Sequence, residues 1–356
     1  MLRAAALLEH RMLLVGPGFS SSPGFASATG PALHDLGTEM LRLFRIESGL
    51  IKEVEVEASE LANQLQHADW IDAHEPDDDE RALLQLLLHT DLPESDEFEE
   101  IETSARCFVD QVGIHVHSLF LSQSEGRHTT VSVACILQSQ HLITIREGDL
   151  ADFRLMRMRA RRGQVECRSP SELLITLLEQ KVENHADTLE DIHRQLEGVS
   201  HMVLEDEESE LEDAISKLAK LEDSNGKIRL CLMDTQRNIS FLLRHLRNQP
   251  DHAETLREIM RDVETLMSHT TFLFDKINFL MDSTQGFINI EQNQIIKIFS
   301  IAAVVFLPPT LVASIYGMNF AHMPELGLSL GYPWALLLMV VSGIAPYWYF
   351  KRKGWL

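Results

Sequence analysis

Two apolar segments near the C-terminal end constrain this 356-residue chain more than any other feature. They span residues 298–316 and 332–350, and neither contains Asp, Glu, Lys, Arg or His. Each approaches the roughly 20 apolar residues that cross a bilayer as a helix. The alternative is a buried hairpin of a soluble protein, but core helices rarely run so long without a polar face. The pattern therefore predicts two transmembrane helices in contact with a lipid bilayer.

The charges around these segments predict their orientation. Residues 317–331 contain no Lys or Arg, whereas Lys297 precedes the first segment and Lys351, Arg352 and Lys353 follow the second. Lys and Arg are enriched on the cytoplasmic flanks of membrane helices. We therefore expect an external loop over 317–331, a basic cytoplasmic tail over 351–356, and both termini in the cytoplasm.

The residues before the first segment indicate one long helix that continues into it. Apolar residues recur at spacings of three and four from Leu256 to Phe287, and no Pro interrupts the pattern before Pro308. We expect a stalk helix over 251–316, roughly 90–100 Å long at 1.5 Å per residue. Such a helix must pack on neighbours, and two spans cannot enclose a water-filled path. Several copies of the chain are therefore expected to associate.

Residues 166–250 are predicted to form a helical hairpin. Ser169, Pro170 and Glu172 make a capping box with Pro at the first helical position. Two coiled-coil-like apolar seams follow, separated by the acidic residues 205–213, which we expect at the tip of the hairpin.

Residues 40–165 are predicted to form an α/β cytoplasmic domain. Together with the long helices and the two spans that follow it, this domain gives a predicted α+β fold class. Residues 112–121, 129–137 and 142–146 have the pattern of strands, and acidic residues around Asp78 mark a helix start. The strand order stays open. Residues 1–39, rich in Gly, Ser, Pro and Ala, are predicted to be a disordered, dispensable extension.

The net charge of −23 is concentrated outside the apolar segments. Acidic excess argues against nucleic acid as a partner and suits a surface that attracts cations. No nucleophile and base are arranged as in an enzyme, so we expect none. His115 and His117 share one strand face as two possible metal ligands, although a plain strand is the favoured interpretation.

The loop between the spans carries the most specific motif. Gly317-Met318-Asn319 directly follows the first span, and Met323, Pro324, Glu325 and Leu326 come shortly after it. With the basic C-terminal end and residues 287–293 before the first span, this arrangement resembles the CorA family of divalent-cation transporters. The resemblance covers nearly the whole chain from Met40 onward.

This resemblance implies a channel-like importer of Mg²⁺, passing also Co²⁺ and Ni²⁺, in the bacterial cytoplasmic (inner) membrane. CorA-like proteins are pentamers whose pore is lined by the first span, so a homopentamer is implied here. The resemblance matches Asn293 and Thr310 to polar pore positions and Leu307 to an apolar constriction. One helical face holds the candidate pore-lining residues Asn293, Ile296, Phe299, Ala303, Leu307, Thr310 and Ser314. The alternative is that this face packs helix against helix.

A selectivity loop is expected at Gly317, Met318, Asn319 and Glu325. Neutral amide oxygens of Asn319 would accept hydrogen bonds from the water shell of Mg²⁺, which dehydrates reluctantly. Gly317 is expected to permit a tight turn, Met318 to pack beneath the amide ring, and Glu325 to raise the local cation concentration.

The sequence contains no Walker motif, and the two spans contain no acidic residue. It therefore gives no sign of coupling to ATP hydrolysis or to proton exchange. A divalent cation entering a negative interior gains about 4.6 kcal/mol per 100 mV, so the membrane potential suffices as the driving force.

Regulation by intracellular Mg²⁺ is also implied by the resemblance. It places one side of a gating site at Glu99 and Glu100 and the other near Glu258 and Asp262, so Mg²⁺ is both cargo and regulator, with no organic cofactor. Glu258 departs from the shorter Asp of the family pattern, and solvated helix acids are the alternative. Two functional alternatives stay open: a zinc transporter of the same superfamily and a non-conducting, membrane-anchored Mg²⁺ sensor or scaffold.

Overall fold

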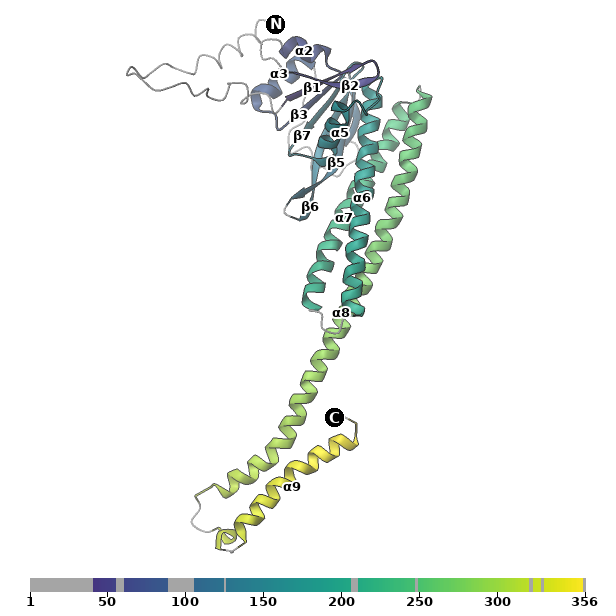
Figure 1. The fold of residues 1–356 in the computed structure, drawn as a ribbon. Coiled ribbons are helices and arrows are strands. Elements are labelled where there is room, and N and C mark those ends of the chain that lie inside the picture. The colour runs from purple at the N-terminus through teal and green to yellow at the C-terminus, as the bar shows by residue number, and fades with distance from the viewer. Residues whose placement is uncertain are drawn as a thin grey trace, which may run out of the picture. The chain divides into compact units, whose positions relative to one another are not determined.

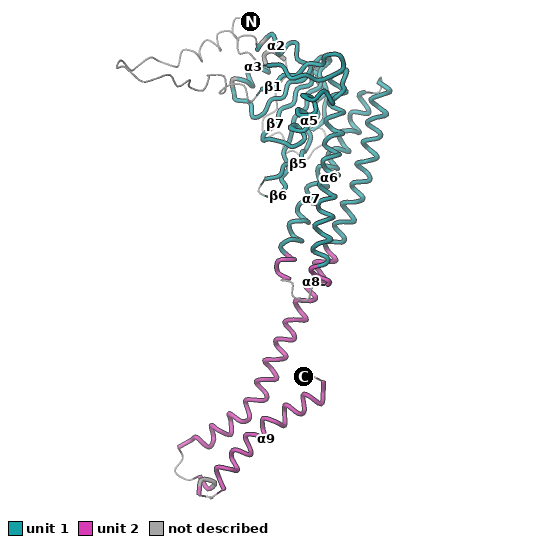
Figure 2. The backbone as a smooth tube through the Cα atoms, in the orientation of Figure 1, with its two compact units in different colours: residues 1–201, 216–277 teal, residues 202–215, 278–356 magenta. Residues whose placement is uncertain are grey.

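A computed structural model describes residues 41–55, 61–88, 106–124, 126–205, 211–246, 249–319, 323–327 and 330–354. The predicted extension over 1–39 lies outside them. Figure 1 shows an N-terminal α/β part followed by long helices. The chain divides into two compact units, residues 1–201 with 216–277 and residues 202–215 with 278–356 (Figure 2). The boundaries of these units fall inside three long helices.

Unit 1 contains a seven-stranded sheet with the order β2-β1-β3-β7-β6-β5-β4. All neighbours are antiparallel except β3 and β7, which are parallel although about 70 residues apart in the chain. The strands are β1 (Leu41–Glu47), β2 (Leu50–Val54), β3 (Trp70–His74), β4 (Cys107–Val109), β5 (Ile114–Ser124), β6 (Arg127–Leu137) and β7 (Leu142–Arg146). The three predicted strand segments correspond to β5, β6 and β7.

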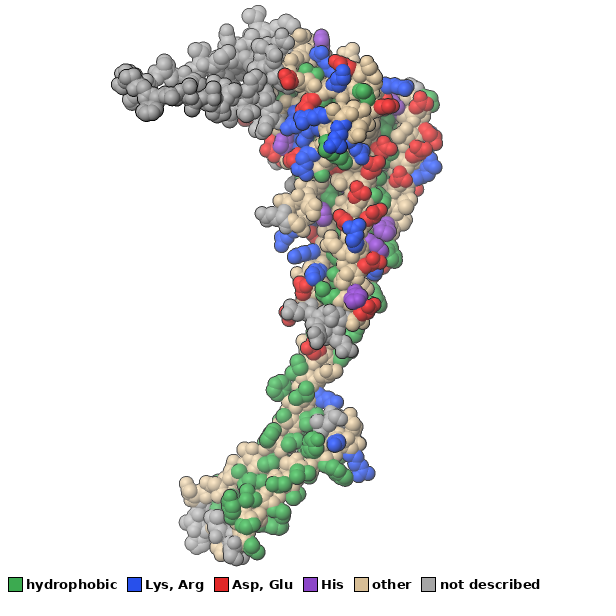
Figure 3. Space-filling model, viewed as in Figure 1, with side chains coloured by type: hydrophobic (Ala, Val, Ile, Leu, Met, Phe, Trp, Pro, Cys, Tyr) green, Lys and Arg blue, Asp and Glu red, His purple; other side chains and the backbone are tan. Residues whose placement is uncertain are grey.

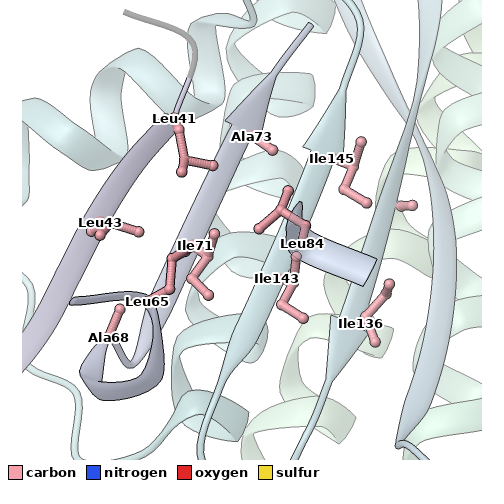
Figure 4. Close-up of a cluster of buried hydrophobic side chains, with 11 residues drawn as sticks. Leu41, Leu43, Leu65, Ala68, Ile71, Ala73, Leu84, Ile136, Ile143 and Ile145 are labelled. Carbon is pink, nitrogen blue, oxygen red and sulfur yellow. The ribbon is translucent and has the colours of Figure 1, made fainter. Parts of the chain in front are cut away.

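One face of the sheet is covered by the short helices α2 (Leu61–His67) and α3 (Asp78–Leu88). In Figure 4, Leu65 of α2 and Leu84 of α3 lie among sheet residues such as Ile71 and Ile143. All four side chains are fully buried. Strand alternation directs this apolar set to a single face, so burying it fixes the strand register.

The opposite face of the sheet packs against α5 (Ala151–Arg161). Phe44 stacks on Trp70 with ring centroids 4.4 Å apart, and Phe153 of α5 lies 6.3 Å from Trp70. The Trp70 indole N–H donates to the Thr144 hydroxyl at 3.0 Å. The aromatic cluster therefore anchors α5 while its one buried donor is satisfied.

The helices α6 (Pro170–Leu204) and α7 (Leu211–His245) follow. The α6 helix begins at Pro170, as the capping box predicted: the Glu172 N–H donates to Ser169 Oγ at 3.2 Å. The Glu172 carboxylate accepts from the Arg168 N–H, one residue before the expected cap. This capping satisfies backbone donors that have no partner within the helix.

A buried polar network joins the sheet to these helices within unit 1. Asp234 of α7 accepts from the Leu119 N–H at 2.8 Å and from Arg106 Nη1 at 3.1 Å. Lys181 of α6 is fully buried, donates to Ser118 Oγ at 2.8 Å and lies 3.8 Å from Asp234. Two buried cations thus share one carboxylate, a combination that is stable only when every partner is present.

The remaining helices are α8 (Pro250–Tyr316), the 3₁₀ helix η2 (Pro324–Gly327) and α9 (Gly331–Arg352). The α8 helix has 67 residues and continues through Gly286, Pro308 and Pro309 without a break, which confirms the expected continuous helix. Both predicted apolar segments are helical.

Candidate functional site

The apolar ends of α8 and α9 form the candidate functional region in unit 2. Both helices are long and apolar enough to cross a membrane by length and composition. Only 6% of each apolar segment is buried in the single chain, whereas the core helix of a soluble protein is mostly buried. Hydrophobic side chains cover most of this hairpin in Figure 3, and Lys and Arg lie near the end where α9 ends.

The two helices meet where α9 contributes a glycine. A Cβ atom on Gly343 would lie 3.3 Å from Cγ of Pro309 and 3.6 Å from the Val305 carbonyl oxygen. Pro309 has no N–H, so the Val305 carbonyl has no helical donor at the usual position. Gly343 therefore allows α9 to approach α8 closely at this point, as small residues do between membrane helices.

Replacing Gly343 by Leu is expected to separate α8 from α9. Overpacking a well-fitted contact costs about 1–3 kcal/mol, so the thermal midpoint of the detergent-solubilised protein should fall. Val341→Leu is the control, because Val341 is 55% exposed on the same helix. Equal midpoints for the two variants would contradict the assigned contact.

All seven candidate pore-lining residues are exposed along α8 in the single chain; they are Asn293, Ile296, Phe299, Ala303, Leu307, Thr310 and Ser314. At about 100° per residue, their stripe lies on the side of α8 opposite to Ile301, Val305 and Pro309. Ile301 is buried, and Val305 and Pro309 face Gly343 of α9. The stripe is therefore free to face other copies of the chain or a water-filled path.

The hydroxyl of Thr310 has a fixed orientation. It donates to the Phe306 carbonyl oxygen at 2.7 Å within α8. Because the hydrogen is used in this bond, the oxygen presents its lone pairs away from the helix. Such an oxygen can accept hydrogen bonds.

The Gly317-Met318-Asn319 turn closes the end of α8. The Gly317 N–H donates to the Ala313 carbonyl at 2.9 Å, and the Met318 N–H donates to the Ile315 carbonyl at 3.3 Å. Asn319 is exposed at the point where the helix has ended. The side chain of the fourth candidate, Glu325 in η2, lies outside what the structure describes.

Gly317 lies in a tight turn, and the reason that the turn suits glycine is steric. Gly317 is not among the described residues with left-handed backbone. Instead, a Cβ atom there would lie 3.1 Å from the Ala313 carbonyl oxygen, closer than ordinary van der Waals contact. The tight approach to the preceding turn, rather than backbone freedom, therefore disfavours larger residues.

The candidate regulatory residues Glu258 and Asp262 are exposed on α8, one helical turn apart. Burial is the largest cause of a raised pKa for Glu179 on α6, and the charges of Glu183, Asp262 and Glu258 raise it further. Glu179 and Glu183 therefore lie in the same region as the predicted pair, and the sequence analysis did not name them. The only signal in the sequence was their i, i+4 spacing, which places both on one face of α6. Glu99 and Glu100 lie outside the described residues.

The candidate histidine ligands are enclosed in the sheet. Both are buried, and His115 Nε2 lies 3.0 Å from Asp110 while its ring stacks on Phe108. Burial lowers the pKa of His117 to about 4. Within the residues that the structure describes, no three His, Cys, Asp or Glu side chains are grouped to hold a metal ion. A strand packed by neutral histidines is the better description of this segment.

Comparison with known proteins identifies relatives along most of the chain. The family model described as CorA-like Mg²⁺ transporter protein matches residues 66–352. The magnesium transport protein CorA of Escherichia coli K12 is 50% identical over 319 residues, 89% of this chain and 100% of that protein.

Two solved structures share the fold at low identity. The CorA magnesium transporter from Methanocaldococcus jannaschii is 20% identical with a TM-score of 0.66, covering 90% of this chain and 100% of that chain. The ZntB cytoplasmic domain from Vibrio parahaemolyticus is 12% identical with a TM-score of 0.53. The match covers 70% of this chain and 98% of that chain. These two likenesses concern the fold alone.

Proposed function

Because this chain belongs to the CorA-like Mg²⁺ transporter family, we propose that it carries Mg²⁺ across the bacterial cytoplasmic membrane. The observation that carries the proposal is the exposed, uncharged stripe on α8 from Asn293 to Ser314, with the exposed Asn319 beyond the end of the same helix. Family membership likewise favours a transporter over an enzyme.

The conducting unit is a homo-oligomer. Each chain supplies two membrane helices, which cannot enclose a water-filled path, and the stripe opposite α9 is available to face other copies. A pentamer, implied by the resemblance, would place five copies of this stripe around one axis. In that arrangement Leu307 forms an apolar constriction, and Asn293 and Thr310 form polar rings.

Selectivity comes from neutral oxygen atoms at the end of α8. Mg²⁺ holds its water shell tightly, and a ring of carboxylates would bind the ion too strongly for release. Amide oxygens of Asn319, followed by the outward lone pairs of Thr310, accept hydrogen bonds from that shell. Glu325 adds negative potential outside the pore.

The membrane potential drives the flux inward, since a divalent cation gains about 4.6 kcal/mol per 100 mV on entering a negative interior. The basic residues at 351–353 set the orientation, with an external 317–331 loop and cytoplasmic termini.

Uptake by reconstituted vesicles tests this function. The purified protein is placed in vesicles with an imposed inside-negative potential, and entry of Mg²⁺, Co²⁺, Ni²⁺ and Zn²⁺ is compared with protein-free vesicles. We expect saturable Mg²⁺ entry that also admits Co²⁺ and Ni²⁺. Entry of Zn²⁺ without Mg²⁺ would favour a zinc transporter. Mg²⁺ binding without entry would favour a non-conducting sensor or scaffold.

Intracellular Mg²⁺ closes the pore by bridging carboxylates of adjacent subunits. Glu258 and Asp262 supply one side and Glu99 and Glu100 the other. Binding would relieve repulsion among like charges and favour the closed state.

The double variant Glu258→Gln with Asp262→Asn is therefore expected to be protected less well by Mg²⁺ against cleavage by chymotrypsin. The Mg²⁺ concentration for half-protection should rise by about tenfold or more, because two of the carboxylates that attract the cation are lost. Glu264→Gln is the control, since Glu264 is exposed on the other flank of the buried seam of α8. Equal protection in both variants would place the regulatory site elsewhere.

A further inference from the structure

A pocket of about 350 Å³ in unit 1 is lined almost wholly by arginine. Arg154, Arg157 and Arg161 recur at helical spacing on one face of α5, Arg162 follows at its C-cap, and Arg42 comes from β1. Met158 completes the lining. In Figure 3, Lys and Arg side chains gather over the region where Figure 1 labels α5. This concentration of positive charge contrasts with the net charge of −23 for the whole chain.

Carboxylates balance only part of this charge. Arg154 pairs with Asp149, and Arg161 pairs with Glu53 at 2.7 Å. Arg157 lies 3.3 Å from Asp72, a carboxylate that it shares with Arg146 at 3.1 Å. Three of the five pocket arginines therefore pair with carboxylates, and one of these carboxylates, Asp72, is shared with a further arginine outside the pocket lining.

The two remaining arginines of the pocket are Arg42 and Arg162. Neither Arg42 nor Arg162 makes an ion pair with any residue that the structure describes. They enter the pocket from different elements, a strand and a helix end. A ligand between them would therefore be held from two directions.

The floor of the pocket is buried and hydrogen-bonded. The Arg157 side chain is 10% exposed, and its partner Asp72 is completely buried. Asp72 also accepts from the Thr144 hydroxyl at 3.0 Å and from Arg146 through both carboxylate oxygens. Burial lowers the pKa of Arg157, and the charges of Arg42 and Arg146 lower it further. An anion entering the pocket would relieve this repulsion, because its negative charge offsets that of the neighbouring guanidinium groups.

We propose that this arginine pocket binds an anion that carries phosphoryl groups, held by the unpaired guanidinium groups of Arg42 and Arg162. Planar guanidinium forks match phosphate oxygens through paired hydrogen bonds, which makes Arg the preferred residue for such ligands. The volume falls within the range of small-molecule sites, about 300–1,000 Å³, so a diphosphate fits better than a single phosphate. Soluble phosphate compounds and phospholipid headgroups share this chemistry.

Calorimetric titration of the full-length protein in detergent, without Mg²⁺, tests the proposal. Pyrophosphate is the probe for soluble ligands, and a short-chain phosphatidylglycerol is the probe for lipid headgroups. The test variant is Arg42→Gln with Arg162→Gln. The matched control is Arg159→Gln, because Arg159 lies on the same helix but pairs with Glu183 at 3.5 Å and does not line this pocket.

The double variant is expected to bind the preferred probe at least about tenfold more weakly, since two charge-assisted contacts are lost, while the control stays within about twofold. Preference for pyrophosphate would assign a soluble phosphate compound, and preference for the lipid would assign a headgroup. Absence of saturable binding for both probes, or equal affinity in the double variant and the control, would overturn the proposal.

Discussion

Replacing Asn319 by Ala is expected to abolish selective Mg²⁺ uptake by reconstituted vesicles while the protein still assembles and inserts. Asn319 is exposed beyond the end of α8, so its amide contributes nothing to packing in the single chain. Its proposed role is to accept hydrogen bonds from the hydrated cation, and Ala leaves only a methyl group. Loss of one such preorganised polar contact per subunit is expected to reduce uptake by about 100-fold or more.

Two further variants sharpen this test. Asn319→Asp keeps the size but adds charge, so the ring should hold cations more tightly and pass them more slowly or less selectively. Ser342→Ala is the control, because the Ser342 hydroxyl lies in the membrane hairpin but donates to the Met339 carbonyl within α9. Wild-type Mg²⁺ uptake by an Asn319→Ala protein of normal oligomeric state would refute the selectivity ring.

Replacing Asp234 by Ala is expected to produce the largest loss of stability in unit 1. Asp234 is 4% exposed and accepts hydrogen bonds from Arg106, Ser118, Leu119 and Asn238. Its removal leaves two buried cations without their carboxylate, which costs about 3–5 kcal/mol. A marked fall in the thermal midpoint of the detergent-solubilised protein is the expected measurement.

The same helix offers a matched control for this variant. Asp223 of α7 pairs with Lys227 at 2.6 Å, but its side chain is 52% exposed. Exposed ion pairs contribute about 0–1 kcal/mol, so Asp223→Ala should shift the midpoint only slightly. Similar shifts in the two variants would show that the buried network does not hold the sheet to the helices.

The local features of this protein were readable from sequence. Helix starts depend on side chains within a few residues, so the capping box at Ser169 and the acidic helix start around Asp78 were visible as short motifs. In α3, the Glu80 N–H donates to Asp77 Oδ1 at 2.8 Å, and the Asp77 N–H donates back to Glu80. The stripe from Asn293 to Ser314 was likewise readable, because helical periodicity alone puts its members on one face. The likeness of the motif around Asn319 to one family then supplied the proposed role.

Other features depend on contacts between distant parts of the chain. The parallel pairing of β3 with β7 joins residues about 70 positions apart, so alternation within either strand could not reveal it. The sequence indicated a turn at Gly317, but the short distance from a Cβ atom there to the Ala313 carbonyl oxygen, which explains the glycine, is visible only in the structure. No spacing rule links Glu179 of α6 to Glu258 and Asp262 of α8.

The sequence by itself determined the two apolar spans, the continuous stalk helix and the motif at its end, since periodicity, length and capping act over a few residues. Only the tertiary structure decided the strand order, the burial of Lys181 against Asp234, and the meeting of Arg42 with the arginines of α5. These three features depend on contacts between side chains that are far apart in the chain. Only the packing of the whole unit decides which of those side chains meet in the interior or on one surface.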